Sequence, residues 1–163
     1  MLLGGILLAA GFPLLTSAQH VIDLSGDNWT VKNAQGNVSA PASLPSQVHL
    51  DLFAAGAIPD PYAGTNEIDL RWIAWSNWTY TSHPVKGLLG NASSSWLVFN
   101  GLDTFATIEL CNKVVGTANN QFRQWQFDIS DALKSCKGDP VISINFGSAP
   151  EIANAIATET GQE

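Results

Sequence analysis

Acidic side chains gather in the stretch IPDPYAGTNEIDL, residues 58–70, which contains Asp60, Glu67 and Asp69. A retaining glycosidase uses two carboxyl groups about 5–5.5 Å apart, so these residue types invite that interpretation. Oxygen ligands could also hold Ca²⁺, but the regular alternation of an EF-hand loop is missing. The same composition describes a solvated loop whose acids cap turns or pair with Arg71. We therefore expect neither a catalytic pair nor a metal site here.

Three tryptophans follow at intervals of three residues, Trp72, Trp75 and Trp78 in RWIAWSNWTY. Flat indole rings can stack on the apolar face of a sugar. In a strand, however, alternation sends Trp72 and Trp78 to one face and Trp75 to the other. The three rings then cannot form one platform. We expect Trp72 and Trp78 to be mostly packing residues and Trp75 to be the exposed ring.

The composition excludes several classes of function. Hydrophobic residues make up 45% of the 163 residues, enough for the core of one domain. The 14 acidic residues outnumber 7 scattered basic ones, giving a net charge of -7. Nucleic acids and anionic membranes attract clustered Lys and Arg, so neither partner is expected. No nucleotide-binding, metalloprotease, serine-hydrolase or paired CxxC motif occurs, and we expect no cofactor.

The N-terminus resembles a secretion signal. Residues 1–18, MLLGGILLAAGFPLLTSA, are uncharged and mostly apolar, and small residues end the segment at Ala18. The apolar run is shorter than the roughly 20 residues of a membrane span. A buried N-terminal helix is the alternative. We expect cleavage after Ala18 and a secreted β-sandwich domain over residues 19–163 that is incomplete at its C-terminal end.

Potential modification sites agree with secretion. Four N-x-S/T triplets lack an intervening proline, and their acceptors are Asn28, Asn37, Asn77 and Asn91. In an oxidising compartment the two cysteines, Cys111 and Cys136, can form a disulfide. Two isolated buried thiols are the alternative.

Short apolar runs between turn residues predict an all-β sandwich or barrel. The predicted strands occupy residues 21–24, 29–31, 95–99, 104–110, 114–116, 122–129 and 141–146. Residues 104–110 alternate in polarity, so one face of that strand is expected to be wet. Ser46–Ala55 predicts a short helix with Ser46 as its N-cap and Gly56 beyond its end. Further helical turns are expected at residues 128–134 and 152–157.

Several motifs occur in a specific order over nearly all of residues 20–150. They are LPSQVHLDL (44–52), AG (55–56), IPDPY (58–62), NE (66–67), LRW (70–72), WTY (78–80), FNGLDT (99–104), FR (122–123), FDI (127–129) and LK (133–134). This combination resembles the start of β-mannosidases of glycoside hydrolase family two, and a secreted fungal-type member fits best. The resemblance implies a jelly-roll-like, galactose-binding-domain-like β-sandwich with one or two short helices.

In that family this domain precedes immunoglobulin-like domains and a TIM barrel with two catalytic glutamates. The resemblance therefore implies a retaining exo-β-mannosidase whose catalytic residues lie outside these 163 residues. It assigns no catalytic residue to this chain, which by itself is expected to be inert. The implied partners are β-mannoside oligosaccharides and the downstream barrel of the same polypeptide, with a homodimer left open.

The resemblance also implies that the loop Asp60–Trp72 packs toward the barrel and helps to wall the active-site mouth, because related family-two enzymes reach from this domain toward the sugar. Asn66 and Glu67 would offer hydrogen bonds, Arg71 would pair with a carboxylate, and Trp72 would end the loop. A loop that merely seals one end of the sandwich is the alternative. Two other functions stay open: a stand-alone secreted carbohydrate-binding module, and a structural or interaction domain.

Overall fold

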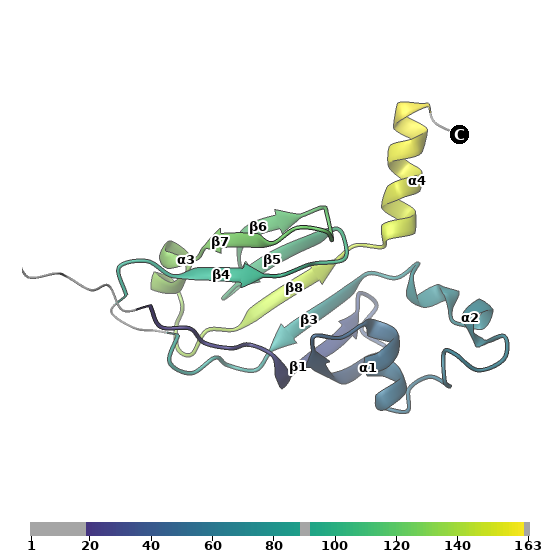
Figure 1. Ribbon diagram of the computed structural model, residues 1–163, viewed down its shortest axis with the longest axis horizontal. Helices are drawn as coiled ribbons and strands as arrows, with labels where there is room; N and C mark the ends of the chain where they lie inside the picture. The colour runs from purple at the N-terminus through teal and green to yellow at the C-terminus, as the bar shows by residue number, and fades with distance from the viewer. Residues whose placement is uncertain (1–18, 89–91, 162–163) are drawn as a thin grey trace, which may run out of the picture.

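The computed structural model describes residues 19–88 and 92–161 as two packed β-layers with short helices (Figure 1). A six-stranded antiparallel sheet has the order β2-β1-β3-β8-β5-β6, and β4 pairs with β7 in a second sheet. The strands are β1 Gly26–Asn33, β2 Ser39–Leu44, β3 Trp78–Ser82, β4 Trp96–Phe99, β5 Ala106–Leu110, β6 Lys113–Ala118, β7 Trp125–Asp128 and β8 Ile142–Phe146. The predicted all-β sandwich is confirmed.

Helices connect these strands. They are α1 Val48–Ala54, α2 Asn66–Asp69, the 3-10 helix η1 Arg71–Ile73, α3 Ser130–Lys134 and α4 Ala149–Thr160. Helix α4, with 12 residues, exceeds the predicted one or two short helices. The predicted N-cap of α1 is wrong, since Gln47 occupies that position and Ser46 bonds to Asp51 instead. Gly56, at φ 69°, does follow the helix as predicted, in the left-handed conformation that glycine tolerates.

Alternation in the large sheet creates one apolar and one polar face. Val31, Tyr80, Ile144 and Ile108 lie side by side on β1, β3, β8 and β5, and all four are buried. The opposite face carries hydroxyl and amide side chains, and Thr79 donates a hydrogen bond of 2.8 Å to Asn145. The wet face predicted for residues 104–110 is confirmed, because burial alternates along β5.

Strand β2 was not predicted, because its sequence SAPASL has little β-propensity and contains Pro41. It lies at the edge of the sheet, beside β1, where a proline removes no hydrogen bond to a second neighbour. The predicted strand at residues 21–24 is not formed. There the backbone oxygen of Leu24 accepts a hydrogen bond of 2.8 Å from the Trp29 indole.

The apolar face is covered in two parts. Near β6 the covering strand is β7, and a Cβ atom on Gly116 would come within 2.1 Å of the Phe127 ring. Only glycine therefore permits the two sheets to approach this closely. Near β1 and β2 the cover is α1, which lies in front of these strands in Figure 1 and buries Leu52 completely.

A buried carboxylate fastens α1 to the sheet. Asp51 is 5% exposed and accepts hydrogen bonds from the Tyr80 hydroxyl at 2.8 Å, from Ser46 Oγ at 2.8 Å and from Ser43 N at 3.3 Å. Burial, and then the bond to Asp51, raise the pKa of the Tyr80 hydroxyl, which therefore remains a donor. A buried carboxylate needs such donors, since leaving it unpaired is very unfavourable.

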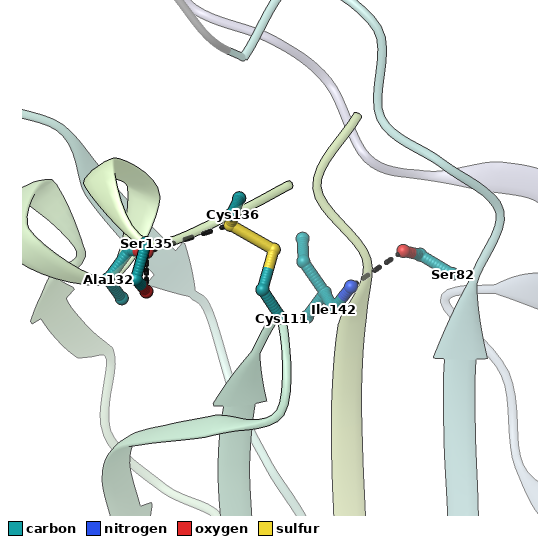
Figure 2. The surroundings of a disulfide bond; sticks show 6 residues. All are labelled: Ser82, Cys111, Ala132, Ser135, Cys136 and Ile142. Atoms are coloured by element: carbon teal, nitrogen blue, oxygen red, sulfur yellow. Dashed lines mark hydrogen bonds between the residues drawn. A yellow bond between two sulfur atoms is a disulfide. The ribbon is translucent and has the colours of Figure 1, made fainter. Parts of the chain in front are cut away.

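A disulfide joins Cys111 to Cys136 across 25 residues (Figure 2). Cys111 and Asn112, at φ 51° and 64°, form the two-residue turn between β5 and β6. Cys136 follows α3, so the bridge ties the large sheet to the segment after β7. Of the two alternatives that the sequence left open, the structure contains the bridge. Strand β6 begins at Lys113, one residue before the strand predicted at residues 114–116.

We expect Tyr80→Phe to lower the free energy of unfolding by about 1.5–3 kcal/mol, because the buried carboxylate of Asp51 loses a donor. Urea unfolding measures this. The raised pKa of Tyr80 adds a pH dependence. The contribution of the Tyr80 hydroxyl to the free energy of unfolding is fully present below about pH 10, where the phenol of the unfolded chain is protonated. This contribution is lost as the pH rises above that value. Tyr80→Phe abolishes this component.

The matched control is Tyr62→Phe, at the other tyrosine, whose side chain is 82% exposed. It removes the same hydroxyl from a surface position and should change the stability little. Equal losses in the two variants would contradict the assigned role of the Asp51–Tyr80 bond.

Candidate functional site

The sequence-predicted site lies in the long α1–β3 excursion, defined here as residues 55–77, which contains α2 and η1. Its shape comes mainly from local hydrogen bonds. Asp60 accepts a bond of 2.9 Å from Tyr62 N, and its backbone oxygen accepts one of 2.8 Å from Asn66 Nδ2. Gly64, at φ 58°, supplies the left-handed residue before α2. The excursion is therefore a folded element whose polar side chains partly hold it together.

The predicted site residues differ in their surroundings. Asn66 is half-buried and bonded to Asp60, whereas Glu67 is exposed. Within residues 19–88 and 92–161, neither Asn66 Oδ1 nor the Glu67 carboxylate takes part in a hydrogen bond. Both retain free hydrogen-bonding capacity at the surface.

The expected pairing of Arg71 with a carboxylate is wrong. Arg71 is exposed, and the one ion pair in the described ranges joins Lys134 to Asp131 at 2.7 Å. Arg71 begins η1, and its backbone oxygen accepts a hydrogen bond from Ala74 N. Turn hydrogen bonds thus fix this segment without the guanidinium. An exposed ion pair would add little, because water screens it and two long side chains must be ordered.

The tryptophans do not follow strand alternation, because Trp72 lies in η1 and β3 begins only at Trp78. Trp78 is 4% exposed and donates a hydrogen bond of 2.8 Å to Ile73 O, so its predicted packing role is confirmed. The ring of Trp72 contacts that of Trp78, with 6.0 Å between centroids, yet Trp72 remains 38% exposed. Trp75 is 48% exposed, as predicted. Trp72 is thus less buried than expected.

Exposed apolar side chains concentrate on this part of the molecule. Half of the large hydrophobic residues that are exposed in the described ranges lie between positions 50 and 75. They are Leu50, Phe53, Tyr62, Ile68, Trp72 and Trp75. Single exposed hydrophobic residues are ordinary, so the notable feature is that six of them fall within 26 consecutive residues.

No cofactor chemistry is evident in the described residues. They contain no cluster of three or more His, Cys, Asp or Glu side chains suited to a metal ion. Across the same ranges, no helix combines the length and the apolar character that a bilayer span requires.

Three of the predicted glycosylation acceptors can be placed. Asn28, in β1, and Asn37, in the turn before β2, are exposed, as is Asn77, directly before β3. Asn91 and the predicted leader at residues 1–18 lie outside the described residues.

Sequence reasoning missed Ser148, which is 2% exposed and connects the excursion to α4. Its hydroxyl donates a hydrogen bond of 2.9 Å to Ala74 O, and its backbone N–H donates one of 2.7 Å to Asn77 Oδ1. The signal for a helix start was present, since Ser148-Ala149-Pro150-Glu151 has the S-x-x-E pattern of a capping box.

Comparison with known proteins now assigns the family. The model described as "Glycosyl hydrolase 2 galactose-binding domain-like" matches residues 29–163. The chain belongs to this family. The sandwich described above is thus the galactose-binding-domain-like fold that the sequence motifs predicted, and the predicted family is confirmed.

Similar proteins are β-mannosidases. Beta-mannosidase A of Aspergillus niger is 55% identical over 161 residues, which cover 99% of this chain and 17% of that protein. Beta-mannosidase A of Aspergillus terreus is 56% identical over 140 residues, covering 86% and 15%. The crystal structure of a β-D-mannosidase from Dictyoglomus thermophilum superimposes with a TM-score of 0.78 at 30% identity, covering 86% of this chain and 17% of that one. The chain therefore spans only about one-sixth of the length of these relatives.

Proposed function

We propose that this chain is the N-terminal, non-catalytic domain of an exo-acting β-mannosidase. The whole protein would remove terminal non-reducing β-D-mannose from β-mannosides by a retaining mechanism, using two glutamates downstream of residue 163. The observation that carries this proposal is the 55% identity to Beta-mannosidase A of Aspergillus niger along 99% of the chain. The substrates would be β-mannoside oligosaccharides, and the direct partner would be the catalytic barrel of the same polypeptide.

Within that enzyme, the α1–β3 excursion would help to wall the mouth of the active site. Its exposed aromatic residues, Tyr62, Trp72 and Trp75, suit contacts with a barrel rim or with the apolar face of a sugar. The free oxygens of Asn66 and Glu67 suit sugar hydroxyl groups, which both donate and accept hydrogen bonds. The two ends of the excursion are held, by Asp51 before it and by buried Trp78 after it. A held loop costs little ordering entropy when it contacts substrate.

A stand-alone carbohydrate-binding module is the second candidate, and the exposure of Trp72 and Trp75, 38% and 48%, favours it. The two functions differ in what the downstream polypeptide contributes. A module needs no barrel, whereas the proposed enzyme cannot act without one.

We expect the whole protein to hydrolyse an aryl β-mannoside with retention of configuration, and residues 19–163 alone to show no turnover above background. The excursion lacks the paired carboxyl groups that only the barrel would align. Steady-state kinetics and NMR of the first-formed mannose anomer measure both points. Inactivity of the whole protein on β-mannosides, with mannan binding by residues 19–163, would favour the binding module. Turnover by residues 19–163 alone would contradict the proposed division of labour.

We expect Asn66→Ala and Glu67→Ala in the whole enzyme to lower kcat/KM by roughly tenfold or more, equivalent to about 1.4 kcal/mol. Glu67→Ala should leave the melting temperature unchanged, since the exposed carboxylate has no partner within residues 19–88 and 92–161. Asn66→Ala also removes the bond to Asp60 O and should cost at most about 1 kcal/mol of stability.

The matched control is Asp69→Ala, which removes an exposed acid from the same excursion and should keep normal kinetics. Normal kcat/KM in the Asn66 and Glu67 variants, with lowered stability, would show that the loop only seals the sandwich.

We also propose that the protein is secreted and glycosylated. Support comes from the signal-like leader, the Cys111–Cys136 disulfide and the exposure of Asn28, Asn37 and Asn77. Mass spectrometry of the secreted protein should find a mature chain beginning at Gln19. Enzymatic deglycosylation should convert at least two of the four acceptor asparagines to aspartate. An intact Met1, or unmodified asparagine at every acceptor, would count against this proposal.

A further inference from the structure

Beyond its first turn, helix α4 leaves the body of the domain without packing on it. Figure 1 shows α4 pointing away from both sheets beyond the end of β8, and none of its 12 residues is buried. Isolated helices shorter than about 12–15 residues are marginal in water. Local sequence alone therefore supports α4 weakly, and a helix in this position is expected to need a partner.

The base of α4, in contrast, is held firmly. Ser148 Oγ accepts a hydrogen bond of 3.3 Å from Glu151 N, which caps the helix, and donates one of 2.9 Å to Ala74 O. In a capping box the glutamate side chain would accept the Ser148 N–H. Here Asn77 Oδ1 accepts it at 2.7 Å. The excursion thus supplies part of the helix cap and fixes the direction in which α4 leaves the domain.

The first turn of α4 also packs closely on the connecting chain. A Cβ atom at position 147 would lie only 2.7 Å from Ile152 Cδ1. Glycine at this position therefore leaves room for the Ile152 side chain. One turn further along, Ile156 has no such cover and is 46% exposed. Polar Glu151, Asn154 and Thr158 lie on the opposite face of the helix. Helix α4 therefore presents a short apolar stripe, Ile152 and Ile156, that begins at the domain and ends one turn further along at the exposed Glu159.

We infer that α4 docks through this stripe onto the catalytic portion of the same polypeptide, and that α4 and the excursion form one docking surface. The inference rests on the proposed function, under which the chain continues beyond residue 163. The relatives support an occupant on the same polypeptide, since this chain matches only 17% of the Aspergillus niger protein. A partner on the same polypeptide is held at high effective concentration. A narrow apolar stripe is therefore enough for α4 to stay docked. The excursion is hydrogen-bonded to the base of α4 through Ala74 O and Asn77 Oδ1, and Trp75, next to Ala74, contributes an exposed ring.

Hydrogen exchange in the whole protein tests this. Amides in the second half of α4 should be protected in the wild type, because docking prevents fraying. Ile156→Asp should make these amides exchange at least roughly tenfold faster, since it places a charge in the docked stripe. Ile156→Ala should give a smaller acceleration in the same amides, without adding a charge.

The matched control is Thr158→Asp, which adds the same charge to the same half of α4 on its opposite face and should change exchange little. Equal acceleration by Asp at positions 156 and 158, or unprotected amides in the wild type, would overturn the inference. Protection that depends on protein concentration would also overturn it, by identifying a second copy as the occupant. Turnover of the aryl β-mannoside by the same samples tests the proposed function separately, because an inactive protein can still have a docked α4.

Discussion

The apolar face of the six-stranded sheet must be covered along its whole width, and the second sheet has only two strands with which to cover it. A sheet face that buries Val31, Tyr80, Ile144 and Ile108 cannot be left open to water. Strand β7 covers one part, where Gly116 allows Phe127 to approach. The rest requires a second covering element, and α1 with its fully buried Leu52 supplies it.

This division explains why a charged residue occupies the core. Helix α1 has only seven residues and no side-chain cap, so its own sequence stabilises it weakly. Asp51 adds three hydrogen bonds, of which those from the Tyr80 hydroxyl in β3 and from Ser43 N in β2 cross to the sheet. These hydrogen bonds offset the free-energy cost of burying the Asp51 carboxylate. They also hold α1, and with it the end of the helix, in place against the sheet. The start of the α1–β3 excursion is thereby placed at a defined point on the domain.

The excursion in turn determines how the domain can act. Its ends are held by Asp51 and Trp78, while Trp72 and Trp75 between them remain exposed. The same segment accepts the hydrogen bonds from Ser148 that set the direction of α4. The surface proposed to face sugar and the helix proposed to face the catalytic portion are therefore connected by hydrogen bonds.

The sequence by itself determined features that depend on a local period or a single residue. Alternation predicted β5 with its wet face, Gly56 predicted the end of α1, and the ordered motifs predicted both the fold class and the family. These signals are local because side-chain direction in a strand, and the left-handed conformation of a glycine, depend on the backbone at that point.

Tertiary structure decided the features that depend on which segments the fold brings together. Strand β2 forms in a sequence with low β-propensity because β1 offers it an edge. Trp72 leaves the strand pattern because hydrogen-bonded turns occupy residues 66–76, and those turns hold the segment without an ion pair of Arg71 among the described residues. Asn77 caps a helix that begins 72 positions later in the chain, at Ala149. The periodicity of the sequence cannot predict such contacts. The groups that make them are distant in sequence and become neighbours only when the sheet has formed.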